Sequence, residues 1–508
     1  MNLPHSPAEE AVSAELAEVR PALAGPYGAA LGGARAAVLT RLWRALAFEP
    51  LPWVVRRERG PDGITLLLAG GRRLEGPAAD PYTTAATVDE LLLDGVSYRQ
   101  AGRLMSALGV PHGDAFAAEL DDSTASLALS RAGQPAAPEP EPGTTWEWEQ
   151  RIVDGHPYHP NCRSRPGFTV AEQLAYAPEH RPVVTLGLAA VAATECLVAG
   201  GWPAELRDGG RILVPVHPWQ ARHVLKQTGR DPDALRAGYA AHPLMSLRTL
   251  SPVSGGPHVK TALSTRLTSS VRDISGYSIE TAAAVSAFAQ ELCARLDGRL
   301  HITRTLGAVT AHTPDLAAVL REPPEVYADA AAGERVVPVA VLADAPFARS
   351  AAWRAGFARL ALSVCLRVLD LGVALEAHGQ NLLVVLAADD APVRLVYRDL
   401  ADIRISPARL ARHGLPVPPV SGRLVDDDVT VLRRKLFGSL LTGALGATAG
   451  SAAAFGDMLA EAAGLPVTAD TGALLGGPLP TKALTLMRLS PGVPGDQWAE
   501  LPNPLAGG

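Results

Sequence analysis

Hydrophobic residues recur at intervals of three and four over 353–371, which predicts an amphipathic helix. Its apolar positions are Trp353, Phe357, Leu360, Val364, Val368 and Leu371. A second helix is predicted over 87–108. Shorter apolar runs bounded by turn residues predict strands at 211–216, 382–386 and 393–398, and a hairpin from 53–57 and 64–69. The chain mixes helical segments with strands, some of them in hairpins, and has no internal repeat, so we expect an α+β fold.

The length of 508 residues predicts more than one domain. The stretch AGQPAAPEPEPGTT at 132–145 cannot form a hydrophobic core, and a second break falls at Pro323-Pro324. We therefore expect a mainly helical domain at 1–145, a mixed domain at 146–325 and a third domain at 326–508.

Charge and cysteine content exclude several classes of protein. The 46 basic and 52 acidic residues give a net charge of −6, which offers no general attraction for nucleic acid or an anionic membrane. The four cysteines are widely spaced, so a cysteine zinc module or a disulfide framework is not expected. The uncharged stretch 436–456 is diluted by Gly and Ala, which favours a buried helix and loop. We expect a cytoplasmic protein.

Two segments, 245–250 and 258–264, flank a turn-rich stretch and predict a hairpin centred on Ser254. In that register Arg248 lies opposite Lys260, and the face that they share also carries Ser246 and Ala262. Like charges in this position repel each other unless an anion lies between them. Arg266 and Arg272 follow, with no acidic residue from 246 to 272. The hairpin therefore predicts a site for a polyphosphate or a polycarboxylate, with Ser246, Thr249 and Thr268 as hydroxyl donors, or else a solvated basic strand pair.

The segment Gly155-His156-Pro157-Tyr158-His159-Pro160 holds two histidines, each followed by a proline. The prolines argue against a helix that presents both rings to a metal. We interpret the histidines as rigid donors beside Arg163 and Arg165, with purely structural His-Pro turns as the alternative.

A third polar segment, Glu376-Ala377-His378-Gly379-Gln380-Asn381, follows the predicted helix 353–371. The next two predicted strands return the chain to Asp399, which places Asn381 and Asp399 close together. Oxygen ligands of this kind suit Mg²⁺. An Asn and Asp pair in an ordinary loop is the alternative.

Together these segments resemble the siderophore synthetases that work independently of nonribosomal peptide synthetases, the aerobactin-synthetase-like family. The resemblance covers roughly residues 146–490. The stretches that match are GHPYHPNCRSRPGF at 155–168, VPVHPWQ at 214–220, SLRT at 246–249, VKTALSTRLTSSVRDIS at 259–275, EAHGQNLL at 376–383 and YRDL at 397–400. Arg163 stands where the family usually has Lys.

The resemblance implies a dimeric, hand-like enzyme of thumb, fingers and distantly kinase-like palm, built with antiparallel sheets. Such an enzyme uses ATP and Mg²⁺ to adenylate a carboxylic acid, citrate being the first choice, and transfers the acyl group to an amine, hydroxylamine or alcohol. It implies catalytic roles for His156, Lys260, Arg272 and His378. It implies ATP binding by Ser246, Arg248, Thr249, Lys260, His156, Arg163, Gln380, Asn381 and Asp399. The implied substrate ligands are Thr268, Arg272, His378 and Arg266, and the implied metal ligands are Asn381, Asp399 and Glu376.

Two other functions fit parts of the pattern. The stretch from His378 to Asp399 is also similar to the catalytic loop of kinase-like phosphotransferases, although no G-x-G-x-x-G loop precedes it. A noncatalytic protein that binds a carboxylate or a ferric chelate through the Arg and Lys face is the second alternative.

Overall fold

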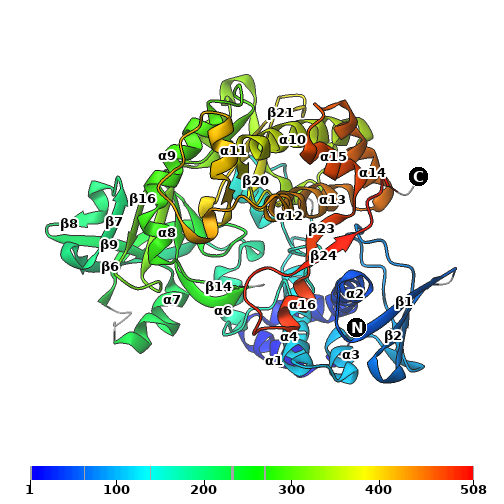
Figure 1. Cartoon of the computed structure of the whole chain (residues 1–508). Coiled ribbons are helices and arrows are strands. Elements are labelled where there is room, and N and C mark those ends of the chain that lie inside the picture. Colours follow the sequence, from blue (N-terminus) through cyan, green and yellow to red (C-terminus); the bar gives the residue numbers. More distant parts are fainter. Residues whose placement is uncertain (1–2, 62, 138, 230–233, 268–269, 507–508) are drawn as a thin grey trace.

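The computed structural model describes residues 3–506, apart from 62, 138, 230–233 and 268–269. The large hydrophobic cores of this part of the chain follow its N-terminal, middle and C-terminal thirds. In Figure 1 these thirds appear as a blue group, a green group and a yellow-to-red group.

The N-terminal third combines long helices with a sheet. Helices α2 (Ala24–Phe48) and α4 (Gly113–Ala132) pack against each other, flanked by α1 (Pro7–Val19) and α3 (Ala101–Leu108). Beside them lies a five-stranded antiparallel sheet of β1 (Val54–Gly60), β2 (Gly63–Leu68), β3 (Arg73–Gly76), β4 (Leu91–Leu93) and β5 (Val96–Tyr98).

The predicted hairpin is present as β1 and β2. The helix predicted over 87–108 is wrong in its first half, because the chain forms β4 and β5 before α3 begins at Ala101. Asp94 and Gly95 have φ angles of 52° and 81° in the turn between these strands. A backbone in the left-handed region cannot continue a right-handed helix.

The middle third is built on a nine-stranded antiparallel sheet. The strand order is β7-β16-β17-β12-β11-β10-β6-β9-β8. Strand β9 (Arg211–Val216) is the predicted strand, and helices α8 (Gly276–Glu280) and α9 (Ala282–Cys293) pack against β7 and β16. The other strands are β6 (Val184–Ala192), β7 (Leu197–Gly200), β8 (Arg207–Asp208), β10 (Arg236–Pro243), β11 (Thr249–Pro252), β12 (His258–Thr261), β16 (Thr305–Thr310) and β17 (Ala317–Arg321).

The C-terminal third is centred on a four-stranded sheet in the order β15-β21-β20-β18, comprising Leu300–Ile302, Pro392–Tyr397, Leu382–Leu386 and Arg335–Pro338. The strands predicted at 382–386 and 393–398 are confirmed as β20 and β21. The predicted amphipathic helix is confirmed as α10 (Ala351–Leu371), which packs on β21. Residues 285–302 share this core, so hydrophobic packing crosses the expected boundary at 325.

Short helices and strands complete this third. They are β19 (Val373–Ala374), β22 (Arg404–Ile405), α11 (Pro407–Arg412), α12 (Val429–Leu436), α13 (Gly446–Ala449), α14 (Ala452–Ala460), α15 (Ala469–Gly476), β23 (Leu479–Lys482), α16 (Leu484–Leu489) and β24 (Trp498–Leu501). A π-helical segment, Phe437–Leu445, joins α12 to α13, and its side chains are mostly buried, as the hydropathy of 436–456 predicts. In the described residues, no single helix is long and apolar enough to span a membrane, and only the pair Val429–Ala449 and Ala452–Gly464, bent by 120°, passes that test by length and composition.

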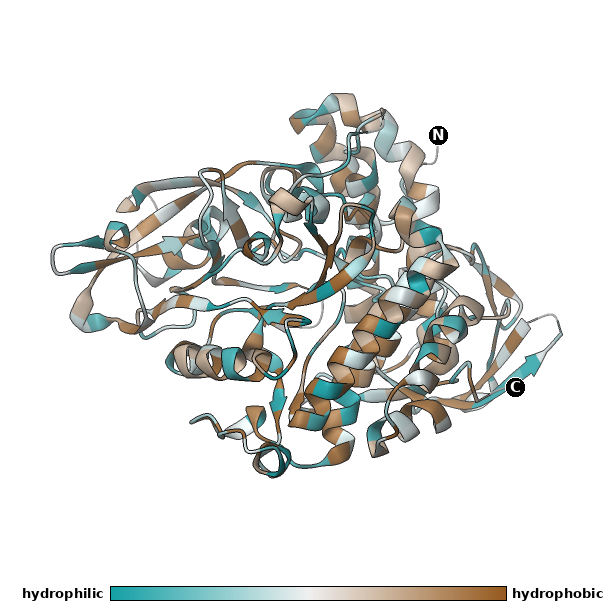
Figure 2. Ribbon diagram, turned by 90° about the horizontal axis from the view of Figure 1, so that it is seen from above, coloured by the Kyte–Doolittle hydropathy of each residue, from teal (hydrophilic) through white to brown (hydrophobic). Residues whose placement is uncertain are grey.

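The fold is thus a mixture of helices and mainly antiparallel sheets, which confirms the expected class at this level. Strand β15 precedes β16 and β17 of the nine-stranded sheet in the chain, but its parallel pairing with β21 makes it part of the four-stranded sheet. Hydrophobic and hydrophilic residues are interspersed along the helices in Figure 2. This pattern follows from elements that bury one face and expose the other.

Candidate active site

A cavity of about 2110 Å³ lies where the three thirds of the chain meet. We call it the cleft. One wall comes from the turn 244–249 between β10 and β11 and from strand β12, and the opposite wall comes from residues 376–381 and 398–404. The histidine segment 155–159 contributes a third side, and Arg41 of α2 reaches it from the N-terminal third.

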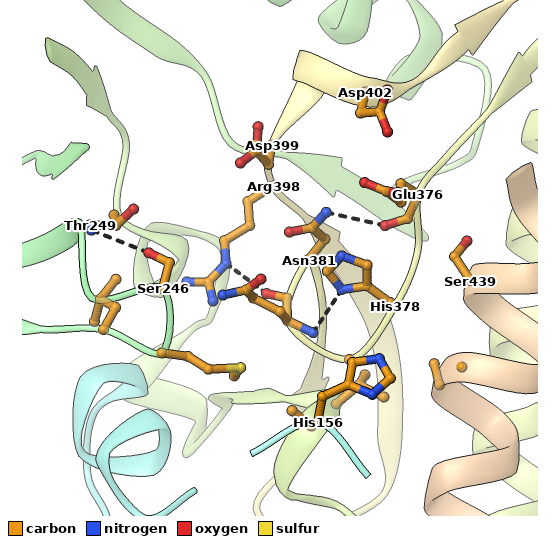
Figure 3. A pocket seen from close by; sticks show the side chains of 18 of the residues that line it. His156, Ser246, Thr249, Glu376, His378, Asn381, Arg398, Asp399, Asp402 and Ser439 are labelled. Carbon is orange, nitrogen blue, oxygen red and sulfur yellow. Dashed lines mark hydrogen bonds between the residues drawn. The ribbon is translucent and has the colours of Figure 1, made fainter. Parts of the chain in front are cut away.

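The first wall contains a tight turn at 244–249 between β10 and β11. The N–H of Leu244 donates to the carbonyl of Thr249 at 2.8 Å, and the Thr249 N–H donates to Oγ of Ser246 at 3.2 Å (Figure 3). Leu247 has a φ of 61°, which is rare for a residue with a branched side chain. The turn therefore directs Ser246 and Arg248 toward the cleft from a strained backbone.

The predicted register of the hairpin is wrong by one residue. Thr249, rather than Arg248, lies opposite Lys260, and Leu250 lies opposite Val259. The regular strand begins only at Thr249, because the left-handed backbone of Leu247 interrupts it. Arg248 and Lys260 nevertheless both line the cleft. Nη1 of Arg248 donates to the carbonyls of Arg272 and Asp273 at 2.5 and 2.7 Å.

Lys260 meets the opposite wall directly. Its Nζ lies 2.7 Å from Oδ2 of Asp399, while Nη2 of Arg321 lies 2.9 Å from Oδ1 of the same carboxylate. Burial lowers the pKa of Lys260 to about 7, although Asp399 acts in the opposite direction. Burial would raise the pKa of Asp399, but Arg321 and Lys260 together hold that pKa well below its ordinary value. A carboxylate shared by two cations therefore occupies the centre of the predicted anion site.

The segment 376–381 forms a compact loop before β20. Nδ1 of His378 accepts the N–H of Gln380 at 3.2 Å, and Nδ2 of Asn381 donates to the carbonyl of Glu376 at 3.2 Å (Figure 3). Burial lowers the pKa of His378, so the ring is neutral at pH 7. Because Nδ1 is an acceptor, the proton of the neutral ring lies on Nε2.

His156 repeats this arrangement on the third side of the cleft. Its Nδ1 accepts the N–H of Tyr158 at 3.2 Å. The ring is accessible from the cleft. The surrounding protein nevertheless keeps bulk water away from it, and this desolvation lowers the pKa of His156 well below its ordinary value; the neighbouring His159 and His378 lower it further. Figure 3 shows the rings of His156 and His378 near each other. The cleft thus contains two neutral imidazoles, each with an Nε2–H donor.

His217 makes the same local turn elsewhere. Its Nδ1 accepts the N–H of Trp219 at 3.1 Å at the start of α7 (Pro218–His223), and the side chain is fully buried. It does not line the cleft. His217 therefore caps its helix, whereas His156 makes the same turn and also faces the cavity.

Two further predicted residues are held by partners within the protein. Arg163 donates through Nε to the Val153 carbonyl at 3.0 Å and through Nη2 to the Ile152 carbonyl at 2.5 Å, and its Nη1 lies 3.2 Å from Glu179. Glu376 lies 3.2 Å from Nζ of Lys435 and 2.9 Å from Nζ of Lys482. Burial would raise the pKa of Glu376, but these lysines lower it to about 2.

The predicted carboxylate ligands are distributed unevenly. Arg272 lines the cleft at the end of β14 (Ser270–Arg272), and the charges of Asp399 and Glu376 act on it. Arg266, on β13 (Leu263–Leu267), is exposed and does not line the cleft. Thr268 lies outside the described residues.

Several cleft residues were not predicted. Arg321 ends the apolar strand β17, and Glu149 and Arg398 form a buried ion pair at 2.7 Å. Lys435 is enclosed by Glu376, Asp402 and Asp496. Nothing local in the sequence marks Glu149, Arg321 or Lys435.

Comparison with known families confirms the resemblance seen in the motifs. Residues 144–344 match the IucA / IucC family, and residues 351–490 match the family described as ferric iron reductase FhuF-like transporter.

Curated relatives include biosynthetic enzymes. A 2-[(L-alanin-3-ylcarbamoyl)methyl]-3-(2-aminoethylcarbamoyl)-2-hydroxypropanoate synthase of Staphylococcus aureus is 27% identical over 207 residues, which are 34% of this chain and 33% of that protein. A citryl-spermidine/3,4-dihydroxybenzoyl-citryl-spermidine:spermidine ligase of Bacillus anthracis is 25% identical over 318 residues, half of each protein. In these two relatives, and in a related protein of Sinorhizobium fredii, the aligned region spans 33%, 50% and 56% of the relative's own length.

Solved structures share the whole fold. The petrobactin biosynthesis protein AsbB of Bacillus anthracis superposes with a TM-score of 0.78 and 18% identity, over 99% of this chain and 98% of that one. The ATP-bound aerobactin synthetase IucA of Klebsiella pneumoniae gives a TM-score of 0.70 and 21% identity, over 93% and 99% of the two chains. At these identities the similarity concerns the fold.

Proposed function

Because residues 144–344 form an IucA / IucC family segment, we propose that this chain is an ATP-dependent synthetase. In this proposal it activates a carboxylic acid, citrate or a related di- or tricarboxylate, as an acyl adenylate and transfers the acyl group to an amine, hydroxylamine or alcohol. The observation that carries the proposal is the meeting of Lys260 and Arg321 with Asp399, beside two neutral histidines, in one cleft.

The cations of the first wall are proposed to bind the triphosphate. Lys260 and Arg321 now share Asp399, and an incoming phosphate offers the same geometry of negative oxygens. Ser246 and Thr249 line the same side of the cleft and add their hydroxyl groups, and Arg248 lies next to them. Arg248 and the turn are held in place before the ligand arrives, and Lys260 and Arg321 exchange one anion for another, so little reorganisation accompanies the charge that develops on the phosphate oxygens.

In the first step, a carboxylate oxygen of the acid attacks the α-phosphorus of ATP and pyrophosphate leaves. The Nε2–H groups of His156 and His378 are proposed to donate to the oxygens that gain charge. Neutral rings suit this role, because they donate without transferring a proton. Arg272 and His378 are proposed to orient the carboxylic acid, whereas Arg266 lies outside the cleft and has no part in this step.

In the second step, the nucleophile attacks the acyl carbon and AMP leaves. The cleft is large enough to hold a nucleotide together with a further substrate, at about 2110 Å³. Enclosure matters here because water competes for the acyl adenylate.

Mg²⁺ fits part of the donor set. Asp399 and the side-chain oxygen of Asn381 would hold it, in a shell completed by water and phosphate oxygens as Mg²⁺ usually requires. Bound there, the ion would neutralise charge on the triphosphate. Glu376 fits less well, because Lys435 and Lys482 already bind its carboxylate. Among the described residues, no group of three or more His, Cys, Asp or Glu side chains forms a metal site.

The remaining features follow the resemblance. We propose a thumb at 1–145, fingers at 146–325 and a distantly kinase-like palm at 326–508, in a homodimer. The meeting of all three thirds at the cleft supports this division.

The test is a screen for pyrophosphate release with ATP, Mg²⁺ and a panel of di- and tricarboxylic acids, with and without polyamines. We expect acid-dependent formation of AMP and pyrophosphate. Lys260→Ala should lower kcat/KM by about 100-fold or more, whereas Lys226→Ala, an exposed lysine outside the cleft, should have no effect. Formation of ADP and a phosphorylated product would identify a phosphotransferase, and binding of citrate without ATP turnover would identify a carboxylate-binding protein.

A further inference from the structure

Glu149 lines the cleft and links its two walls. It lies on α5 (Thr145–Gln150), and its side chain is fully buried. Its Oε2 accepts the N–H of Met245 at 2.9 Å, and its Oε1 accepts Nη1 of Arg398 at 2.7 Å. One carboxylate therefore contacts the turn 244–249 and a residue of the opposite wall.

Arg398 extends this link to the loop 376–381. Its Nε donates to the carbonyl of Gln380 at 3.0 Å (Figure 3), and its backbone N–H donates to the carbonyl of Asn381 at 2.9 Å. Its side chain is only 10% exposed. The path from Met245 through Glu149 and Arg398 to Gln380 thus consists of hydrogen bonds shielded from solvent, which are stronger than exposed ones.

The turn 244–249 needs such support. Leu247 at φ 61° is in a conformation that costs a non-glycine residue free energy. A strained conformation of this kind persists only where its surroundings determine it. Glu149 fixes the N–H two residues before Leu247, and the neighbouring Gln150 donates to the Pro243 carbonyl at 3.3 Å. Helix α5 therefore holds the turn on its N-terminal side.

The second connection between the walls has a different character. Lys260 and Arg321 bind Asp399 across the cleft, but a phosphate would bind to these same two cations. When they turn to the ligand, the walls lose this connection at the moment when their alignment matters most. Glu149 and Arg398 do not depend on those cations.

We propose that Glu149 and Arg398 are positioning residues that hold the turn 244–249 and the loop 376–381 in register while Lys260 and Arg321 exchange Asp399 for a phosphate. This role rests on the proposed function of the cleft. In this role Glu149 and Arg398 stay paired, whereas Lys260 and Arg321 change partner when the ligand binds.

The kinetic test is a double-mutant cycle of Glu149→Gln and Arg398→Gln, measured by pyrophosphate release. Each single variant should lower kcat by about 10- to 100-fold through misalignment, with a smaller change in the KM for ATP. The double variant should lose no more than the larger single loss, because both side chains act through one link. Losses that multiply would overturn the proposal. Arg398→Lys has a single ammonium group that cannot donate to Glu149 and Gln380 together. It should restore the thermal stability that Arg398→Gln loses, but not kcat.

A second measurement does not depend on activity. Hydrogen–deuterium exchange of the protein without ligand should be faster at 244–249 and at 376–381 in Glu149→Gln. The matched control is Glu9→Gln, which alters another buried pair, with Arg35 at 2.5 Å, away from the cleft. Unchanged exchange in both cleft segments would overturn the proposal. If the unaltered protein releases no pyrophosphate with any acid, the proposed function fails, while exchange still decides whether this pair holds the two segments.

Discussion

The ammonium group of Lys260 lies 2.7 Å from Oδ2 of Asp399, although 139 positions separate the two residues. The contact joins the nine-stranded sheet to the segment that follows the four-stranded sheet. Arg321 completes it from a third strand. The predicted anion site is therefore neutralised from within, and a phosphate that binds here replaces a carboxylate rather than filling an uncompensated cationic pocket.

This arrangement predicts that nucleotide binding takes up a proton above neutral pH. Burial lowers the pKa of Lys260 to about 7, so below pH 7 the amine is already charged and no uptake is expected. Above pH 7 the amine is neutral in the free cleft, and the negative triphosphate restores its proton. We expect uptake of up to about one proton at pH 8, and an affinity that falls by up to about tenfold per pH unit. Calorimetric titration with ATP in buffers of different ionisation enthalpy measures both.

The control for this prediction is Lys260→Arg, because arginine keeps its charge at pH 8. The variant should bind ATP without taking up a proton. Equal uptake by the variant and the unaltered protein would assign the proton to another group.

His378 should contribute to the chemical step rather than to nucleotide affinity. His378→Asn keeps an acceptor for the N–H of Gln380 but removes the Nε2–H donor. We expect kcat for pyrophosphate release to fall by about 100-fold, with the dissociation constant for ATP changed less than about threefold. Rapid-quench kinetics and equilibrium binding separate the two quantities.

His217→Asn is the matched control, since His217 makes the same turn outside the cleft. It should affect stability without the selective loss of kcat. An equal loss of ATP affinity and of kcat in His378→Asn would place His378 against the nucleotide instead.

Local pattern was enough to predict several elements. The three-and-four spacing over 353–371 corresponds to α10, and the apolar runs at 211–216 and 382–386 are β9 and β20. The convergence of Asn381 with Asp399 also followed from two strands and a turn, because a hairpin returns its ends to one place. In each of these cases, the residues that determine the structure lie close together in the sequence.

Other parts depended on contacts that sequence does not encode locally. The hairpin register shifted because Leu247 adopts a positive φ, which its hydrophobic side chain gives no reason to expect. The pair of Glu149 and Arg398 spans 249 positions, and each residue alone is an ordinary charged side chain. Arg163 lies within a matching motif, at a position where the family usually has Lys, yet its nitrogens are held by carbonyl groups and a buried glutamate that only the fold brings to it.

Arg163 is therefore predicted to support the fold rather than bind ATP. Its side chain and that of Glu179 are 8% and 0% exposed, so Arg163→Ala leaves a buried carboxylate with one cation fewer. Arg165 still pairs with Glu179 at 2.5 Å, so we expect a loss of about 1–3 kcal/mol in the free energy of unfolding. The folded variant should bind ATP with an affinity within about threefold of the unaltered protein. Chemical denaturation and calorimetry test both; lower ATP affinity at unchanged stability would instead support the nucleotide role that the resemblance implies.

Asp399 and Glu376 are predicted to differ in their effect on the Mg²⁺ requirement. Asp399 faces the phosphate site through Lys260 and Arg321, and it is released when these cations turn to the triphosphate. Glu376 stays bound to Lys435, which is only 3% exposed, and to Lys482. We expect Asp399→Asn to raise the Mg²⁺ concentration for half-maximal pyrophosphate release by about tenfold or more. Glu376→Gln should change it less than about twofold and instead lower the free energy of unfolding by about 1–3 kcal/mol, because two lysines lose a shared partner. Titration with Mg²⁺ at saturating ATP decides the matter, and equal shifts in both variants would place Glu376 at the metal.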